Sequence, residues 1–351
     1  MSKRTLSVGL IGCGWIAEVA HMPSLAASPH ARVVRLVDRM PERRDVARRF
    51  FPDAHAGDDP AALLADASID AVVIATPPGA TPPLAMQALT AGKHVFLEKP
   101  MATTLAEAGS LLAAARRAGT IHLVGYNFRR HEAVLAAAQA LRAGQLGELL
   151  TVHGHFTWQS SGATGWRADP GTGGGALNDL ASHHIDLAAY LAGAPVRAVS
   201  ATLRGIRHAE DTADIALRTD NGVYVTIHAS GAAGRNANAL RLIGTRGHVA
   251  IDLTDPHAAP VLTGDPPRSR AQRLRAALAG LQPQRFVHSG REASFAATMA
   301  AFLAACQSGT PAAPTIEDGA QVLAATDAAR RSAARGGAWV DLDAEPAQHV
   351  A

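Results

Sequence analysis

Short apolar runs alternate with helix-like segments through the first third of the chain. The apolar runs lie at Leu6–Ile11, Ala31–Val37, Ala71–Ala75, His94–Leu97 and Ile121–Val124. Helical patterns fill the intervals, at Ile16–Ala27, Pro41–Phe50, Ala61–Ala67, Pro82–Ala91 and Leu105–Ala118. Continuous apolar strands between helices are typical of a parallel sheet that is covered on both faces. We therefore predict an α/β domain with a doubly wound parallel sheet over residues 1–126.

The pattern changes after Tyr126. Further helices are predicted at His131–Ala143, Ala176–Leu191, Ser294–Gln307 and Ile316–Ala334. Strands are predicted at Leu149–Trp158, Val196–Arg204, Thr212–Arg218, Val223–Ala229, Ala239–Ile243 and His248–Leu253, and loops at Ser160–Gly175 and Asp255–Ser289. Runs of strands with little helix between them favour an open sheet. We predict that residues 127–351 form a C-terminal α+β domain with a large, open, mostly antiparallel sheet.

Composition then narrows the class of protein. Lys and Arg number 33 and Asp and Glu 30, a balance that does not indicate a general nucleic-acid binder. A local patch of Arg268, Arg270, Arg273 and Arg275 is explained more simply by an insertion loop. The 2 cysteines cannot form a disulfide scaffold, which fits a reducing compartment. No stretch reaches about 18 uninterrupted apolar residues. We expect a cytoplasmic protein with neither nucleic-acid nor membrane partners.

A glycine-rich turn follows the first predicted strand. Residues Gly12 to Ala17 read G-x-G-x-x-A, between a strand and a helix, which is the context that dinucleotide binding by a Rossmann domain requires. Gly12 allows the tight turn, and Gly14 lets the backbone approach a pyrophosphate at the helix start. Asp38 ends the second strand, where a carboxylate can bind ribose hydroxyls. This favours NAD, although the adjacent Arg39 can soften the preference and NADP is an alternative.

Four later motifs, taken in order, resemble one known family. They are Ala75-Thr76-Pro77-Pro78, Glu98-Lys99-Pro100, Gly125-Tyr126-Asn127-Phe128-Arg129, and Gly173 to Asp179 running on to His183 and Asp186. The ordered set resembles the glucose–fructose oxidoreductase/inositol dehydrogenase/rhizopine catabolism family of NAD(P)-dependent oxidoreductases. Two positions depart from the family pattern: Thr81 stands where many relatives carry histidine, and Ala181 stands in place of the usual glycine.

The resemblance implies an enzyme that transfers hydride between nicotinamide and a secondary alcohol or ketone of a sugar, cyclic polyol or sugar derivative. The active site would lie between the two domains, and the open sheet would form a homodimer or homotetramer contact. Cofactor contacts are assigned to Gly12, Gly14, Trp15, Ile16, Asp38, Arg39, Thr76, Pro77, Glu98, Lys99 and Asn127. Substrate contacts are assigned to Lys99, Asn127, Trp166, Arg167, Asp179 and His183.

The catalytic residues that the resemblance implies are Lys99, Asp179 and His183. His183 would be the general acid/base and Lys99 its electrostatic partner, although these two roles can be exchanged. Asp179 and His183 are four residues apart on one predicted helix, so they would share a face and the carboxylate could orient the imidazole. His184 would face away from Asp179, and Asp186 would stabilise the helix.

Other interpretations are weighed against this one. The chain has 16 histidines, but no HExxH or Cys/His spacing is present, so we predict no metal site. His153 and His155 lie on one side of a strand that either lines the substrate pocket or faces solvent. Trp166 and Arg167 either contact the substrate or form a structural turn. Alternative functions are an NAD-dependent glycosidase or epimerase that uses transient oxidation, and a dinucleotide-binding regulator.

Asp38 provides a test of the cofactor assignment. Substitution Asp38→Ala should narrow the preference for NAD over NADP, because a 2′-phosphate would no longer meet a carboxylate. The ratio of kcat/KM for the two cofactors measures the effect. An unchanged ratio would mean that Asp38 does not contact the ribose.

Overall fold

The computed structural model describes residues 4–159, 165–254, 261–264 and 293–342. Its first sheet contains β1 (Leu6–Ile11), β2 (Ala31–Val37), β3 (His55–Gly57), β4 (Ala71–Ile74), β5 (His94–Leu97) and β6 (His122–Val124). The strand order is β3-β2-β1-β4-β5-β6, and all the pairs are parallel. This is the order of a doubly wound dinucleotide-binding sheet, so the predicted fold class of the first domain is confirmed.

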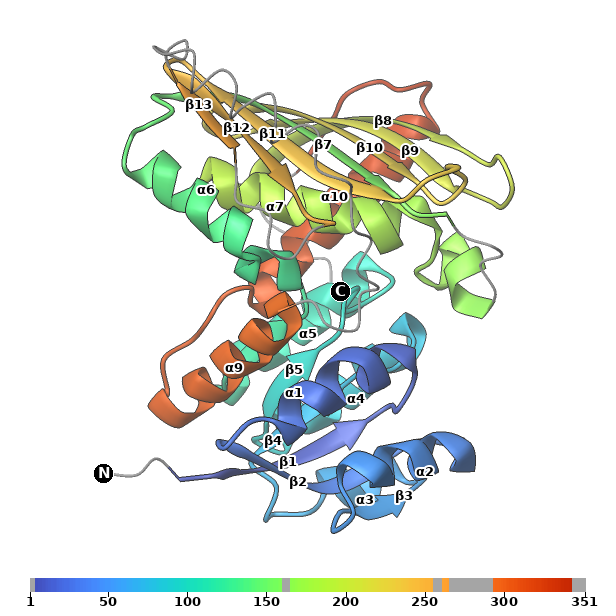
Figure 1. Cartoon of the computed structure of the whole chain (residues 1–351). Helices are drawn as coiled ribbons and strands as arrows, with labels where there is room; N and C mark the ends of the chain where they lie inside the picture. Colours follow the sequence, from blue (N-terminus) through green and yellow to red (C-terminus); the bar gives the residue numbers. More distant parts are fainter. Residues whose placement is uncertain (1–3, 160–164, 255–260, 265–292, 343–351) are drawn as a thin grey trace.

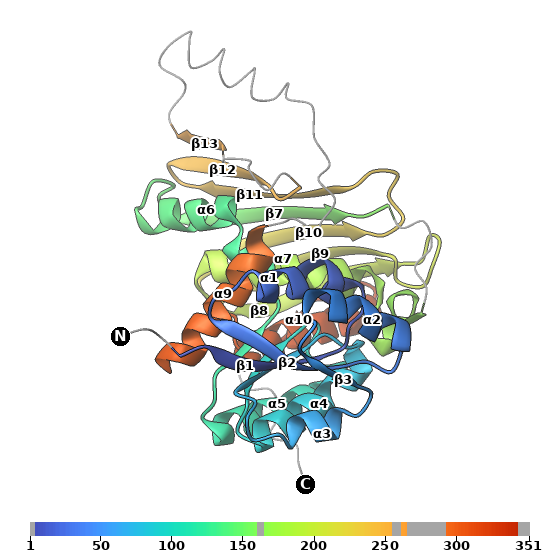
Figure 2. The same cartoon turned by 60° about the horizontal axis from the view of Figure 1, so that its bottom comes forward.

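The helices of this half cover both faces of the sheet, as Figures 1 and 2 show. They are α1 (Met22–Ala26), α2 (Pro41–Phe50), α3 (Pro60–Leu64), α4 (Thr81–Thr90) and α5 (Leu105–Ala118). The predicted helix Ile16–Ala27 departs from a regular α-helix, because a π-helical turn, η1 (Ala17–His21), precedes α1. Pro23 has no N–H to donate to the preceding turn, and a wider turn is one way in which a chain accommodates this loss.

The second sheet has eight strands in the order β13-β12-β11-β7-β10-β9-β8-β14. They are β7 (Leu149–Thr157), β8 (Val196–Arg204), β9 (Thr212–Thr219), β10 (Tyr224–Ser230), β11 (Ala237–Gly244), β12 (Gly247–Asp252), β13 (Val261–Gly264) and β14 (Val340–Asp341). Only the central pair β7–β10 is parallel, so the prediction of a large, mostly antiparallel sheet is confirmed. β13 falls inside the segment Asp255–Ser289 that was predicted as a loop, and the rest of that segment, including its four arginines, lies outside the described residues.

Helices cover one face of the second sheet. In Figure 1, α6 (Glu132–Arg142), α7 (Ser182–Ala192) and α10 (Ile316–Ala333) lie between this sheet and the first domain. Val152 points toward these helices and is buried, whereas His153 and His155 are exposed on the opposite face. The two histidines therefore belong to the open face of the sheet and do not line a pocket between the domains.

Helix α9 (Ala293–Ser308) returns to the first domain. Met299, Phe302 and Leu303 are buried in one cluster with residues of β1, β2 and α1. Phe302 packs edge-to-face on Phe96 of β5, with the ring centroids 5.7 Å apart. The predicted division between residues 126 and 127 stays a prediction, and α9 shows that a segment after it completes the core of the first sheet.

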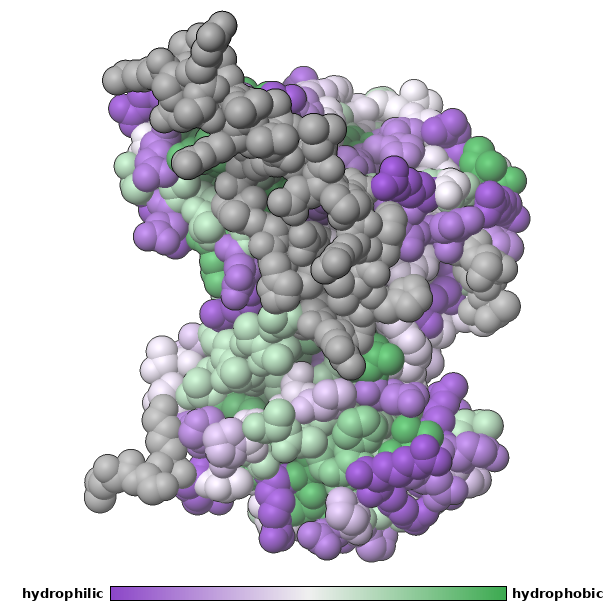
Figure 3. All heavy atoms as spheres, viewed as in Figure 1, coloured by the Kyte–Doolittle hydropathy of each residue, from purple (hydrophilic) through white to green (hydrophobic). Residues whose placement is uncertain are grey.

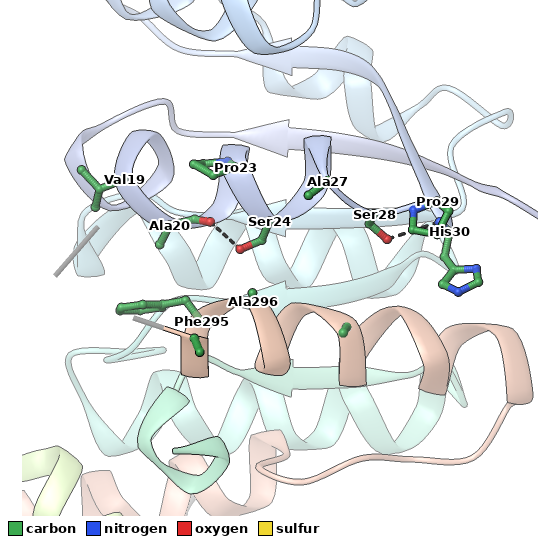
Figure 4. Close-up of a pocket in the computed structure, with 12 residues that line it drawn as sticks. Val19, Ala20, Pro23, Ser24, Ala27, Ser28, Pro29, His30, Phe295 and Ala296 are labelled. Carbon is green, nitrogen blue, oxygen red and sulfur yellow. Dashed lines mark hydrogen bonds between the residues drawn. The ribbon is translucent and has the colours of Figure 1, made fainter. Parts of the chain in front are cut away.

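An apolar groove of about 400 Å³ separates α9 from α1 (Figure 4). Figure 3 shows hydrophobic residues gathered over these two helices on the viewed face. The described lining of the groove includes Val19, Pro23 and Phe295, and among these described residues His30 is the one titratable side chain. Because none of the predicted site residues lines it, the groove is not the candidate active site.

No helix within the described ranges is long and apolar enough to cross a membrane.

Phe302 tests how far the first domain depends on α9. Substitution Phe302→Ala should lower the free energy of unfolding by about 3–5 kcal/mol, because it leaves a cavity beside Phe96. Urea denaturation followed by circular dichroism measures the change. Leu135→Ala, at an exposed position on α6, is the control and should change stability by about 0.5 kcal/mol or less. Equal effects of the two substitutions would contradict the packing role of α9.

Candidate active site

The candidate site lies at the carboxyl edge of the first sheet, where it faces the second domain. The strand order reverses between β1 and β4, and ligands of open α/β sheets bind at such a switch point. The glycine-rich turn follows β1, Thr76 follows β4, and Lys99 follows β5. The sheet therefore brings three of the predicted motifs to one edge, although they are far apart in the chain.

The glycine-rich turn is shaped for a dinucleotide. Gly12 has φ +89°, and a Cβ there would lie 2.6 Å from the carbonyl oxygen of Ala75. A side chain at Gly14 would meet nothing closer than an Arg43 nitrogen at 3.7 Å, so the backbone at Gly14 is open to a ligand. The helical turn begins at Trp15, and backbone N–H groups at a helix start lack acceptors within the helix. The turn fits the pyrophosphate of a nicotinamide dinucleotide.

Asp38 is placed directly beside this turn. Its Oδ2 accepts a hydrogen bond from the N–H of Cys13 at 2.8 Å, and its Oδ1 accepts from the N–H of Met40 at 2.8 Å. These bonds fix the carboxylate at the end of β2. Arg43 also approaches it, with Nη1 3.8 Å from Oδ2. The remaining lone pairs of Asp38 suit the ribose hydroxyls, which agrees with a fit to NAD.

The other predicted cofactor contacts surround the turn. Trp15 and Arg39 are exposed, and Ile16 is half-buried. The hydroxyl groups of Thr76 and Thr81 are hydrogen-bonded to each other at 3.0 Å, and Pro77 is exposed beside them. Thr81 therefore supports the loop that follows β4. Contact of these residues with the cofactor stays a prediction.

Lys99 and Asp179 join the two domains. Lys99 Nζ donates to Asp179 Oδ1 at 2.9 Å and to the Asp179 carbonyl oxygen at 2.8 Å. The Lys99 side chain is 11% exposed and that of Asp179 is 30% exposed, so the pair is partly withdrawn from solvent. Although burial opposes the shift, Lys99 and then Arg167 hold the pKa of Asp179 below its usual value. Asp179 is therefore a carboxylate at neutral pH.

The predicted orientation of His183 by Asp179 stays a prediction. Residues Leu177–Ala181 form a π-helical turn, η6, which precedes α7. Within the described ranges no hydrogen bond joins Asp179 to His183, and Asp179 pairs with Lys99 instead.

Aromatic rings enclose His183. The ring centroids of Tyr126, Phe128 and Phe156 lie 5.9, 4.9 and 6.1 Å from that of His183. His183 is 8% exposed, and its Nδ1 is buried without a hydrogen-bond partner. Burial, followed by the nearby charge of Lys99, holds the pKa of His183 well below its usual value. The imidazole is therefore neutral at pH 7 and can accept a proton.

The Trp166–Arg167 segment approaches the same carboxylate. It lies in a short 3₁₀ turn, η4 (Gly165–Ala168), and the Arg167 guanidinium stacks on the Trp166 ring 4.5 Å from its centroid. Arg167 Nε is 3.8 Å from Asp179 Oδ2. A Cβ at Gly174 would lie 2.2 Å from the Trp166 carbonyl oxygen, so glycine is required where the two segments touch. This contact holds Arg167 beside the site; residues 160–164 of the predicted loop lie outside the described residues.

Two predicted contacts are more buried than expected. The Asn127 side chain amide donates to Ser294 Oγ of α9 at 2.7 Å, and Asn127 is 2% exposed. Glu98 Oε1 pairs with His21 Nε2 at 2.8 Å, and Glu98 Oε2 accepts from the N–H of Lys99. The role of Asn127 and Glu98 as ligand contacts stays a prediction. Sequence reasoning missed His21, because a single histidine on a helix carries no signal of its partner.

Asp186 corrects a further expectation. It was expected to stabilise its own helix, but it forms a buried, two-pronged ion pair with Arg129, at 2.6 and 2.9 Å. Arg129 is 7% exposed and also donates to Asp318. The 57 residues between Arg129 and Asp186 explain why no local pattern predicts this pair.

His184 faces away from Asp179, as predicted. Its Nε2 is hydrogen-bonded to Asn238 Oδ1 at 2.7 Å, and its ring stacks on Phe156. Burial lowers the pKa of His184 to about 4. Elsewhere in the described part of the chain, no group of three or more His, Cys, Asp or Glu side chains is arranged to hold a metal ion.

The low pKa of His184 makes stability depend on pH. The unfolded chain binds this proton near pH 6.5 and the folded chain near pH 4, so the free energy of unfolding should fall as pH falls through that window. Between these two pKa values, one histidine such as His184 changes the free energy of unfolding by about 1.4 kcal/mol per pH unit. Denaturation of His184→Gln at several pH values should show a flatter dependence, and the exposed His153→Gln control should keep the original one. A His184→Gln slope equal to that of the unchanged chain would refute this origin.

Comparison with known proteins agrees with this geometry. Residues 6–126 match the model described as oxidoreductase family, NAD-binding Rossmann fold, and residues 134–250 match the GFO/IDH/MocA C-terminal domain. The chain is 32% identical over 281 residues to a dTDP-3,4-didehydro-2,6-dideoxy-α-D-glucose 3-reductase of Streptomyces violaceoruber, covering 77% of this chain and 80% of the reductase. It is 31% identical over 211 residues to an NADP⁺-dependent scyllo-inositol 2-dehydrogenase of Bacillus subtilis, covering 60% and 58% of the two chains.

Solved structures show the same architecture. Levoglucosan dehydrogenase in complex with NADH superposes with a TM-score of 0.83 at 27% identity, over 97% of this chain and 100% of that one. GenD2 from gentamicin A biosynthesis, in complex with NAD, gives a TM-score of 0.84 at 27% identity, over 97% of each chain. The named relatives are dehydrogenases and reductases that act on CH–OH groups and their ketones. This chain belongs to the GFO/IDH/MocA family of NAD-binding oxidoreductases.

Proposed function

We propose that the protein oxidises a secondary alcohol of a sugar, cyclic polyol or sugar derivative, or reduces the corresponding ketone. The observation that carries this proposal is the meeting of the Lys99 ammonium, the Asp179 carboxylate and the neutral His183 imidazole at the edge of the dinucleotide-binding sheet. The relatives act on a dTDP-deoxysugar, levoglucosan and scyllo-inositol, which supports this class of substrate.

Lys99 has one hydrogen-bond donor to offer to the substrate. An ammonium has three N–H donors, and Asp179 takes two of them through its carboxylate and its carbonyl oxygen. The third can donate to the reacting oxygen and stabilise the negative charge that develops on it. Bound NAD supplies the hydride acceptor for oxidation, and NADH supplies the donor for reduction.

His183 receives the hydroxyl proton in the oxidation direction. Its Nδ1 is enclosed, so Nε2 is the nitrogen that serves the substrate. Its low pKa keeps it neutral, and the positive charge of Lys99 contributes to this. In the reduction direction, the imidazolium returns the proton to the alkoxide. Trp166 and Arg167 would contact the far side of the substrate, next to Asp179.

We further propose that two or four copies associate through the open face of the second sheet, in the cytoplasm. Tyr224 on β10 and Trp339, just before β14, are large apolar residues exposed on this face. Tyr224 contacts Trp339, whose ring Arg218 covers at 4.1 Å. Apolar exposure on a helix-free sheet face supports burial against a second copy.

Substitution of the catalytic pair tests the reaction. Lys99→Met and His183→Asn should each lower kcat by at least about 10²-fold, because each removes a group that acts in the transition state. NADH production with a panel of sugars, inositols and anhydrosugars gives kcat, and fluorescence titration gives the affinity for NADH, which should be largely retained. His153→Asn, on the exposed sheet face, is the matched control and should keep full activity.

The same assays separate the alternatives. Full activity in both catalytic variants would refute the roles of Lys99 and His183. Product formation with retained cofactor and no net NADH would indicate a glycosidase or epimerase that uses transient oxidation. Cofactor binding without turnover of any member of the panel would favour a regulatory protein.

A further inference from the structure

Arg129 is buried where three elements meet. It lies in a 3₁₀ turn, η3 (Asn127–Arg130), and its Nε and Nη2 donate to the two carboxylate oxygens of Asp186 on α7. Nη2 also donates to Asp318 Oδ1, at 3.0 Å, in the first turn of α10. Parallel donation to both oxygens of a carboxylate fixes distance and orientation together. Arg129 therefore holds η3 against α7 in one geometry.

Both ends of this ion pair adjoin His183. Asp186 is three residues after His183 on α7, so the two lie about one helical turn apart. On the other side, Phe128 directly precedes Arg129 in the chain, and the Phe128 ring is the one nearest to that of His183, at 4.9 Å. Tyr126, two residues earlier, packs edge-on against the same ring. The ion pair therefore draws together the helix that carries His183 and the turn that encloses it.

Among the residues that the structure describes, no hydrogen bond orients the His183 ring. Its Nδ1 is buried without a partner, and Asp179 is engaged by Lys99. The orientation of the imidazole must then come from the packing of Tyr126, Phe128 and Phe156 around it. A side chain that is held by packing is only as well placed as the backbone segments that carry its neighbours.

We propose that Arg129 is a positioning residue for the acid–base step: its pairing with Asp186 holds Tyr126 and Phe128 against His183 and keeps the imidazole aimed at the substrate. This inference rests on the proposed function of His183. We call the pairing of Arg129 with Asp186 and Asp318 the clamp. Through Asp318 it reaches α10, which packs on α5 of the first domain as well as on β8 of the second. The Arg129 guanidinium is buried and donates to Asp186 and Asp318.

Two variants loosen the clamp in different ways. Arg129→Lys keeps the positive charge but cannot form the two-pronged bond. The double variant Arg129→Met/Asp186→Asn removes both charges of the pair, so it avoids leaving Asp186 as an unpaired buried charge. In both, water should enter the loosened enclosure of His183, and the pKa of His183 should rise toward its usual value. Burial lowers this pKa most, and the charges of Lys99 and His184 lower it further. Neither Lys99 nor His184 is substituted in these variants, so the expected rise reports the loss of burial.

NMR titration of the His183 ring measures this pKa without any substrate. The signal is assigned by its loss in His183→Gln. With a substrate from the panel, kcat should fall by up to about 10²-fold, as expected for a displaced catalytic group, while KM for NAD stays unchanged. Arg130→Met is the matched control: Arg130 is the next residue and donates to the Ala313 carbonyl oxygen, away from His183.

The outcomes separate the two proposals. A wild-type pKa and kcat in both folded variants, or an equal shift in Arg130→Met, would overturn the positioning role. Loss of folded protein in both variants, judged by circular dichroism, would assign Arg129 to folding alone and also overturn it. If the proposed function fails instead, His183→Gln keeps full activity, and this result does not depend on Arg129.

Discussion

The contact between Lys99 and Asp179 is the interaction on which the site depends. Lys99 ends a strand of the first sheet, and Asp179 precedes the helix that supports the second. Because the ammonium is largely withdrawn from water, it depends on the carboxylate and the carbonyl oxygen of Asp179 for its hydrogen bonds. The pair therefore brings together the proposed catalytic groups Lys99 and Asp179 and links the two domains.

The fold was predictable because its signals are local. Apolar runs placed five of the six strands of the first sheet, and the glycine-rich turn between β1 and the helix identified the dinucleotide-binding half. β3 has three residues and β14 has two, and segments this short show no hydrophobic periodicity from which a strand could be predicted. The π-helical turns at Ala17–His21 and Leu177–Ala181 escaped because helix-forming residues alone do not distinguish them from α-helix.

Sequence motifs named the candidate site residues, whose roles stay predictions, but they did not predict the pairs that these side chains form. Spacing along the helix predicts that Asp179 lies beside His183, and the structure adds an ion pair between Asp179 and Lys99, 80 residues away in the chain. Likewise, Arg129 and Asp186 find each other only after the turn and the helix have packed. Such pairs depend on how elements dock, and a sequence pattern describes each element separately.

Helix α9 has a consequence for the order in which the chain folds during synthesis. The ribosome releases all six strands of the first sheet long before residues 293–308 emerge, yet Phe302 and its neighbours complete the core beside β1 and β5. Until α9 is present, Phe96 and the side of α1 that faces α9 lack the apolar contacts that α9 provides. The domain that is synthesised first therefore completes its core last. During synthesis its apolar surface stays exposed until α9 has been made and can pack on it.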